Sequence, residues 1–255
     1  VAITPDATKA YTTDAIGNVN VINVADLSTI AVIPQTAFGT YTPLFIALSP
    51  NKPEGYISTA DSKVFVINTD TNTVTSSFDL LSGARTFFTA VTPNGSELYV
   101  SNASSNLVFY INLNDGTAHT LVGSFHAVQS TGVAIGPDGK AVYVVQPGAT
   151  ANTLTKIDTS THAVVEEFQI PAQLVAPSAV AISPDGKTAC ITDAGSSSLH
   201  LPGQLVAFID TTTGSSSTLQ LSSAPQSALA GVAITPDPAP TARFTATASG
   251  SAVTF

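Results

Sequence analysis

One short pattern recurs along the whole chain: an apolar segment that ends in a proline-centred turn. It reads VAITPDATKAY from residue 1, VAIGPDGKAVY from residue 133 and VAISPDGKTAC from residue 180. The spacings between successive prolines of the pattern are 45, 43, 44, 47 and 52 residues. Internal periods of about 40 to 50 residues are typical of solenoids and β-propellers, in which each repeat forms one structural unit. The recurring prolines are Pro5, Pro50, Pro93, Pro137, Pro184 and Pro236.

Two further landmarks follow these prolines in register. A tyrosine stands six positions after the proline in the first four repeats, and Cys190 takes that position in the fifth. A hydrophobic residue, an isoleucine and then an asparagine or aspartate close a later segment, except that the fourth repeat begins this triplet with Lys156. An Asx side chain can hydrogen-bond its own backbone and start a turn. The tyrosines are Tyr11, Tyr56, Tyr99 and Tyr143, and the Asx residues are Asn23, Asn68, Asn112, Asp158 and Asp210.

These landmarks predict four short antiparallel strands in each repeat. The segment before the proline is the first strand, and Pro-Asp-Gly or Pro-Asn-Gly is a tight turn, because proline pre-sets its φ and glycine accepts a positive φ. The tyrosine segment is the second strand and the segment ending in Asx is the third. A stretch such as 164–168 is the fourth. No segment combines a helical apolar period with helix caps, so we expect essentially no helix.

Four-stranded antiparallel units at this spacing predict an all-β chain folded as a β-propeller. A β-helix would need coils of about 20 residues without fixed hairpin turns, and an immunoglobulin-like array about 100 residues per unit. We expect six blades, with repeats that begin near residues 1, 46, 89, 133, 180 and 232. Seven blades, or five blades and a partial one, are the alternatives.

Three segments resemble the YVTN family of β-propeller repeats. YVSN at 99–102 lies close to the four letters that name the family, the segment 180–198 matches its first hairpin, and KIDTSTHAVVEEF at 156–168 matches its second. The resemblance covers residues 1–236, and this family consists mostly of surface and exported proteins. It therefore implies a propeller in a surface or exported protein. Related seven-bladed propellers include lactonases, so it also implies a hydrolase as an alternative.

Residues 237–255 depart from the repeat. Pro238 replaces the turn glycine, Ala242 stands in the aromatic position, and the segment from 238 to the last residue resembles the opening of a PKD-type domain, an immunoglobulin-like module. Two interpretations remain open. The segment supplies the closing strands of the last blade, or it is the stub of a PKD-like domain.

The composition favours strands and excludes several partners. Charged residues make up 10% of the chain, and the formal net charge of −9 argues against a polyanion such as nucleic acid. No run of about 18 apolar residues predicts a membrane span. The single cysteine, Cys190, excludes an intrachain disulfide.

Low charge, abundant serine and threonine, and an acidic balance resemble exported bacterial surface proteins. We therefore expect an extracellular or cell-surface location in a bacterium. The sequence begins at Val1 and contains no methionine, so we also expect a processed or trimmed product.

The loops that join the fourth strand of one blade to the first strand of the next surround one mouth of a propeller's channel, where ligands usually bind. In these loops the strongly ionisable residues are an arginine and a histidine, without a carboxylate that could orient the histidine as a general base. A surface arginine and a histidine bonded to backbone are the interpretation we favour. Aromatic residues in the same loops could provide platforms for a sugar. The candidate ligand-binding residues are Arg85, His126, Phe38, Tyr41, Phe87 and Phe88.

Other candidate sites carry weaker signals. The fifth repeat is longest between its proline and the recurring isoleucine, 25 residues against 17 in the first, and places His200 and Leu201 in a candidate partner-contact loop. Loops tolerate such insertions at a small entropic cost, which is the interpretation we favour. No histidine spacing predicts a metal site. Asn68, Asp70 and Asn72 imitate the start of a calcium loop but lack its glycine, so we interpret them as a turn.

The sequence thus predicts a non-catalytic binding or scaffold propeller that mediates protein or surface interactions. A lactonase-like hydrolase and a carbohydrate-binding propeller are the alternatives. We expect no catalytic residues, no metal and no cofactor, a protein or glycan partner at the cell surface, and a monomer.

Overall fold

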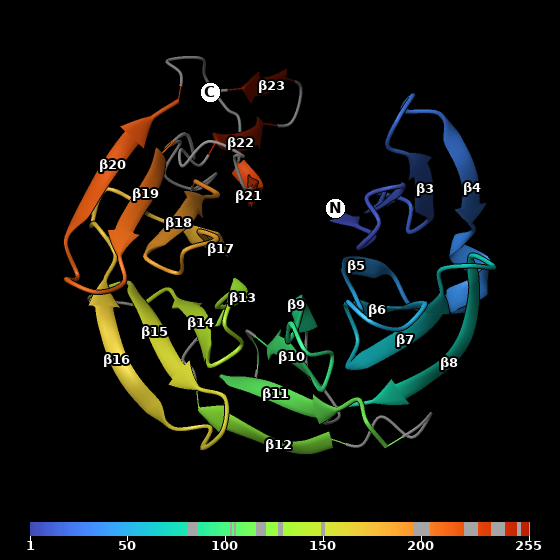
Figure 1. The fold of residues 1–255 in the computed structure, drawn as a ribbon, viewed down its shortest axis with the longest axis horizontal. Coiled ribbons are helices and arrows are strands. Elements are labelled where there is room, and N and C mark those ends of the chain that lie inside the picture. The colour runs from blue at the N-terminus through green and yellow to red at the C-terminus, as the bar shows by residue number, and fades with distance from the viewer. Residues whose placement is uncertain are drawn as a thin grey trace. The chain divides into compact units, whose positions relative to one another are not determined.

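The computed structural model describes most of the 255 residues, in segments separated by short gaps. The described residues are 1–80, 86–102, 104, 106–115, 121–126, 130–148, 151–195, 205–221, 229–235, 243–248 and 251–254. The chain divides into two compact units, Val1–His126 and Ala127–Phe255. Each unit is built from consecutive antiparallel sheets (Figure 1).

The first unit consists of three four-stranded sheets. A 3₁₀ helix, η1 (Gln35–Phe38), joins the first sheet to the second, and it is the only helix in the described part of the chain. The expectation of essentially no helix is therefore confirmed for these residues. The strands are β1 (Ala2–Ile3), β2 (Lys9–Thr13), β3 (Val19–Asn23), β4 (Thr29–Ile33), β5 (Pro43–Leu48), β6 (Glu54–Thr59), β7 (Lys63–Asn68), β8 (Thr73–Asp79), β9 (Thr86–Val91), β10 (Glu97–Asn102), β11 (Leu107–Asn112) and β12 (Leu121–His126).

The second unit consists of two four-stranded sheets and one three-stranded sheet. Their strands are β13 (Val133–Ile135), β14 (Ala141–Gln146), β15 (Thr153–Asp158), β16 (Val164–Gln169), β17 (Pro177–Ile182), β18 (Thr188–Asp193), β19 (Leu205–Asp210), β20 (Ser216–Gln220), β21 (Leu229–Thr235), β22 (Arg243–Ala248) and β23 (Ser251–Thr254).

The four-stranded sheets are propeller blades. In every one of them the strands lie in chain order, and within each unit the first strand of a blade contacts the first or second strand of the blade before it. Thus β5 contacts β1 and β2, and β17 contacts β13 and β14. The all-β propeller expectation is confirmed.

The expectation of six blades is wrong. The structure has five four-stranded blades, followed by the sheet β21–β23, which has only three strands in the described part of the chain. The sequence explains the difference, because the sixth repeat loses its pattern after Pro236, where Pro238 replaces the turn glycine. Strand β22, from the segment 237–255, pairs with β21, and β23 pairs with β22.

The proline turns form as the sequence predicts. In the repeats that carry a turn glycine, its N–H donates to the carbonyl three residues earlier, as from Gly139 to Gly136 at 2.9 Å and from Gly186 to Ser183 at 2.8 Å. Gly139 has a φ of 71° and Gly186 a φ of 74°. Proline supplies the fixed φ inside this turn and glycine supplies the left-handed residue that ends it.

The Asx residues also act as predicted. Each accepts a hydrogen bond from the N–H two residues later, for example Asn68 from Asp70 at 2.9 Å and Asp210 from Thr212 at 2.8 Å. The N–H of the residue after the Asx donates back to the segment before the second strand, as from Thr211 to the carbonyl of Lys187 at 2.9 Å. The third-strand turn and the proline turn therefore lie together at the same end of each blade.

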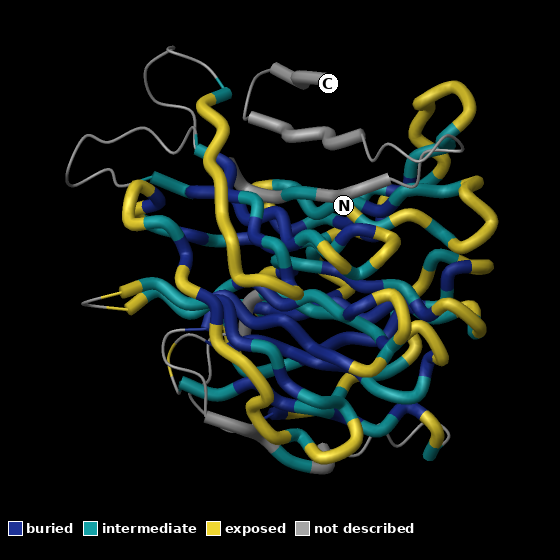
Figure 2. Tube along the Cα trace, turned by 60° about the vertical axis from the view of Figure 1, so that its left-hand side comes forward, coloured by how far each residue is buried: buried dark blue, intermediate teal, exposed yellow. Residues whose placement is uncertain are grey.

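The core lies between blades. Side chains of a strand alternate between its two faces, so neighbours on β6 enter different interfaces. Tyr56 packs with Leu98 and Phe109 of the third blade, while Ile57 packs with Tyr11 of the first. Figure 2 shows such strands as continuous buried segments, whereas the turns and several outer strands are exposed.

Cys190 takes the tyrosine position on β18 and is buried beside Val206. Burial raises the pKa of its thiol to about 12. The thiol therefore packs as a small apolar group, as the sequence predicts.

We predict that Gly55→Ala destabilises the chain by about 1–3 kcal/mol, the usual penalty for overpacking a core. A Cβ on this β6 residue would lie 2.8 Å from Cδ2 of Leu48 and 2.9 Å from Cγ1 of Ile67. Gly136→Ala is the matched control, because the atom nearest to its Cβ would be Oδ1 of the exposed Asp138, at 3.3 Å. Urea unfolding followed by circular dichroism measures both, and equal midpoints for the two variants would contradict the packing argument.

Candidate functional site

The structure places two of the predicted loop residues in the core of the first unit. Phe38 is 1% exposed, and its ring meets that of Phe65 edge-on at 5.2 Å. The ring of Tyr41 lies 5.7 Å from the same Phe65, and Nζ of Lys63 lies 5.4 Å from the centre of the Tyr41 ring. Both aromatic rings are thus engaged with protein side chains.

Of the other predicted site residues, only Phe88 has a described side chain, and its ring stacks on that of Phe45 at 3.9 Å. Arg85, His200 and Leu201 fall in the gaps. Phe87 lies on β9 and His126 ends β12, but only their backbone is described. The predicted sites at the channel mouth and in the 193–205 loop therefore stay predictions.

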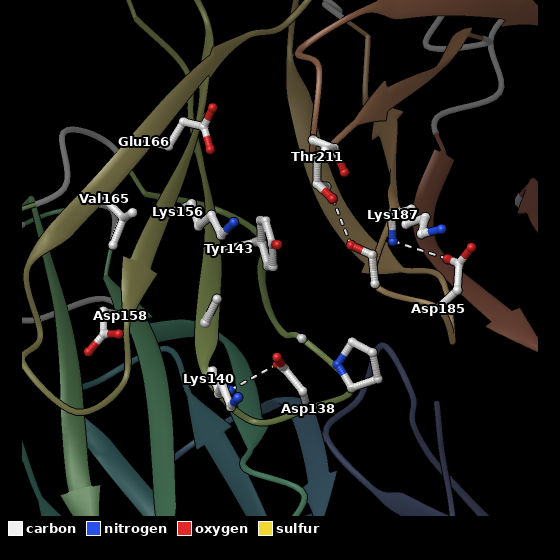
Figure 3. A pocket seen from close by; sticks show the side chains of 15 residues that line it. Asp138, Lys140, Tyr143, Lys156, Asp158, Val165, Glu166, Asp185, Lys187 and Thr211 are labelled. Atoms are coloured by element: carbon white, nitrogen blue, oxygen red, sulfur yellow. Dashed lines mark hydrogen bonds between the residues drawn. The ribbon is translucent and has the colours of Figure 1, made fainter.

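The second unit contains a cavity of about 580 Å³ between the blades β13–β16 and β17–β20. It lies at the end of the strands where the proline turns and the Asx turns meet, which is the opposite end from the loops that the sequence singled out. Figure 3 shows Tyr143 and Lys156 on one side of it and Lys187, Asp185 and Thr211 on the other. Its lining is Gly136, Pro137, Asp138, Lys140, Ala141, Tyr143, Lys156, Asp158, Val165, Glu166, Asp185, Gly186, Lys187, Thr211 and Thr212.

The first unit shows what fills the same place between its own blades. Nζ of Lys9 donates to the carbonyl of Thr69 in the next blade at 2.7 Å, and Nζ of Lys52 donates to the carbonyl of Leu113. Each of these carbonyls belongs to the residue after an Asx. A lysine chain of one blade therefore crosses to the Asx turn of the next.

The second unit lacks that lysine. Counted from the proline, Ala141 occupies the position of Lys9 and Gly139 that of Lys52, while Thr211 follows an Asx residue as Thr69 does. Neither alanine nor glycine can reach the Thr211 carbonyl. The space that the lysine chain would fill is left open, and Ala141 and Thr211 both line it.

A row of three side chains across β14, β15 and β16 opens the cavity further. Tyr143 pairs with Lys156, which pairs with Glu166, so the three share one face of the blade. The matching row in the second blade is Tyr56, Val66 and Ser76. Where Val66 is buried in the interface with the next blade, Lys156 leaves a polar, half-buried surface.

The hydroxyl of Tyr143 is aimed into the cavity. In the first blade the single proton of the equivalent Tyr11 hydroxyl has two acceptors within reach, Oδ1 of Asn72 at 2.6 Å and the carbonyl of Thr69 at 3.1 Å. Tyr143 is only 4% exposed, yet its hydroxyl has no hydrogen-bond partner among the described residues, and Figure 3 shows it pointing towards the facing blade. The hydroxyl oxygen is not among the buried unpartnered atoms of the described residues, so water or a ligand in the cavity can bond it.

Half of the chain's lysines line this cavity. Lys140, Lys156 and Lys187 form no ion pair or side-chain hydrogen bond within the described residues. The other three lysines, all in the first unit, are engaged: two bind backbone carbonyls, and Nζ of Lys63 lies 2.6 Å from Oδ1 of Asp79.

The carboxylates of the cavity are fixed by their own turns. Oδ1 of Asp158 accepts hydrogen bonds from Ser160 and Thr161, which lower the pKa of Asp158 to about 2. A hydrogen bond from Ser183 likewise lowers the pKa of Asp185. Both groups are ionised at neutral pH. Their second oxygens have no partner among the described residues and remain available as acceptors.

Similarity to known proteins is confined to the fold. No protein-family model matches the chain, and no curated protein sequence matches it. Among solved structures, the chain is similar to hydrazine synthase of Kuenenia stuttgartiensis, with a TM-score of 0.63 and 26% sequence identity over 80% of this chain. The chain spans 55% of the length of that protein chain. This similarity supports a β-propeller.

Metal-binding clusters and membrane-spanning helices are both absent from the described residues. These residues contain no group of three or more histidine, cysteine, aspartate or glutamate side chains placed to hold a metal ion. None of the helical segments in this part of the chain has the length and apolar character to span a membrane.

Sequence reasoning missed the cavity, although one signal pointed to it. Lys156 stands where the other described third strands carry a valine or an aromatic residue: Val21, Val66, Tyr110 and Phe208. A lysine in an otherwise apolar interface position indicates a blade that does not close against its neighbour.

We predict opposite behaviour for two equivalent tyrosines. Tyr11→Phe removes the hydroxyl that donates to Asn72 and Thr69 and should destabilise the chain by about 0.5–1.5 kcal/mol, whereas Tyr143→Phe should change stability by less than about 0.5 kcal/mol. Thermal unfolding of both variants beside the parent measures the difference. Equal losses of stability would mean that the Tyr143 hydroxyl also has a structural partner.

Proposed function

We propose that the protein is a non-catalytic binding propeller of the bacterial cell surface or extracellular space, and that its ligand occupies the cavity between β13–β16 and β17–β20. The resemblance to YVTN-type repeats and the PKD-like tail support the surface location. The main support for this binding site is the Tyr143 hydroxyl, which lines the cavity and has no hydrogen-bond partner among the described residues.

The charges of the cavity favour binding over proton transfer. A general acid or base works best with a pKa near the operating pH. Hydrogen bonds instead hold the pKa of Asp158 at about 2 and lower that of Asp185. Permanent charges of both signs on rigid turns suit the recognition of a polar ligand.

The absence of a filling side chain also supports a site. Two other blade pairs close this gap with a lysine. The interface between β13–β16 and β17–β20 lacks a counterpart of Lys9 or Lys52, and it carries Lys156 where other blades have an apolar residue. It is therefore less tightly packed than those interfaces. A ligand that enters the gap restores that packing.

We predict that Ala141→Lys weakens binding, because the new side chain can take the path of Lys9 and bond the Thr211 carbonyl. The purified chain and this variant are titrated by calorimetry with four probes: an oligogalacturonate, a neutral galacto-oligosaccharide, polyglutamate and polylysine. At least one probe should bind the parent chain and bind Ala141→Lys about tenfold more weakly or worse, which corresponds to about 1.4 kcal/mol.

Lys63→Met is the matched control, since Lys63 lies in the first unit and pairs with Asp79. Thermal unfolding verifies that Ala141→Lys is folded, and Lys156→Met provides a second test if it is not. Failure of every probe to bind, or equal binding to the parent and to both cavity variants, would contradict the proposed site.

A further inference from the structure

We infer that the ligand of this cavity is an acidic sugar unit, whose anionic group is bound by the lysines and whose hydroxyls donate to the carboxylates. The inference rests on the proposed function, because it names the ligand class of the same site. It goes further by assigning the three lysines and the turn aspartates to different parts of one ligand.

The lysines supply the anion-binding part. Lys140 and Lys187 come from the proline turns of two blades, and Lys156 comes from β15. All three lysines line one cavity in a chain with a net charge of −9, and none of them forms an ion pair in the described residues, although the charge of Lys187 lowers the pKa values of Asp185 and Asp210. Charge-assisted hydrogen bonds from ammonium to carboxylate or sulfate are about twice as strong as neutral ones.

The aspartates supply the acceptor part. Asp138, Asp158 and Asp185 each bind a turn N–H through Oδ1, which fixes the carboxylate and leaves Oδ2 free of partners in the described residues. An ionised carboxylate can only accept hydrogen bonds. The ligand must therefore bring donors close to its anionic group, and a sugar ring does so with its hydroxyls.

The same carboxylates disfavour an acidic peptide. The carboxylate side chains of such a peptide bring no hydrogen-bond donors to Asp138, Asp158, Glu166 and Asp185, whereas the hydroxyls of a sugar do. Peptide recognition also depends on an exposed sheet edge, an apolar groove or an arginine cluster. The apolar side chains of this lining are only Pro137, Ala141, Val165 and the buried ring of Tyr143.

The size and surface of the cavity suit one or two sugar units that carry charge. A volume of about 580 Å³ lies within the range of small-molecule sites, about 300–1,000 Å³. No aromatic face is presented for stacking by the described lining, since Tyr143 is 4% exposed. A neutral sugar therefore lacks an apolar platform, and the charged group has to supply the affinity.

The test compares digalacturonate with the neutral disaccharide of the same ring type, by calorimetry on the full chain. Digalacturonate should bind at least about tenfold more tightly. A sulfated disaccharide is the third arm, because sulfate and carboxylate offer the lysines the same charge, and its affinity relative to digalacturonate identifies the anionic group. Polyglutamate and polylysine are titrated in parallel.

Variants assign the two parts of the site. Lys156→Met should weaken digalacturonate binding about tenfold while leaving the weak binding of the neutral disaccharide unchanged. Asp158→Asn should weaken both sugars, because the lost acceptor serves hydroxyls. Lys63→Met should change neither.

Several outcomes would overturn the inference. Equal affinity for the neutral and the acidic disaccharide would show that the lysines do not bind an anion. Binding of polyglutamate or polylysine that Ala141→Lys weakens, without binding of acidic sugars, would keep the proposed site but replace the ligand class. Absence of binding by every probe would overturn the inference and the proposed function together.

Discussion

Everything in this structure depends on strands that are buried on both faces. Because side chains alternate along a strand, Tyr56 and Ile57 enter the interfaces with two different neighbouring blades. No described blade has a core of its own, and its stability comes from the blades beside it. The repeat pattern follows from this constraint, since each repeat must supply one apolar face to the blade before it and one to the blade after it. The short proline and Asx turns bring the strands into register but bury little.

The candidate site is a local departure from that constraint. At the turn end of the strands, two blade interfaces of the first unit fill the space beside the Asx turn of the next blade. Lys9 and Lys52 fill it in the first unit by reaching a backbone carbonyl. Between β13–β16 and β17–β20 the same positions hold Ala141 and Gly139, and the gap becomes a cavity lined by turn carboxylates and lysines. The apolar packing deeper in this interface, such as that of Leu154 with Ile191 and Ile209, is kept.

Much of the fold was predictable from the sequence, because the turn residues and the alternating apolar residues act locally. The proline turns, the Asx turns and the four strands of each complete repeat follow from residues such as Gly139 and Asp158. The expected count of six blades was wrong, although five blades and a partial one stood among the alternatives, because the sixth repeat keeps its first strand and then loses the turn glycine. The cavity was not predictable, because it depends on which lysine of one repeat faces which turn of the next. In the sequence, Lys140 is an ordinary turn residue. Only the structure shows that it lines the same cavity as Tyr143 and Thr211.

A repeating architecture limits how much stability such a site removes. In a repeat protein, stability is roughly a sum of the repeats and of the interfaces between neighbours. An open gap at one interface therefore lowers the contribution of that interface and leaves the packing of the others intact. The hydroxyl of Tyr143 is part of that decrease, because it lacks the hydrogen bond that the Tyr11 hydroxyl donates, which is worth about 0.5–1.5 kcal/mol. A lysine at 141 that donates to the facing turn would close the gap. The sequence lacks that lysine at this interface, while it has one at two others. Ligand binding at this gap requires an interface that stays open and polar. The interface between β13–β16 and β17–β20 stays open because it lacks the lysine that closes two other interfaces.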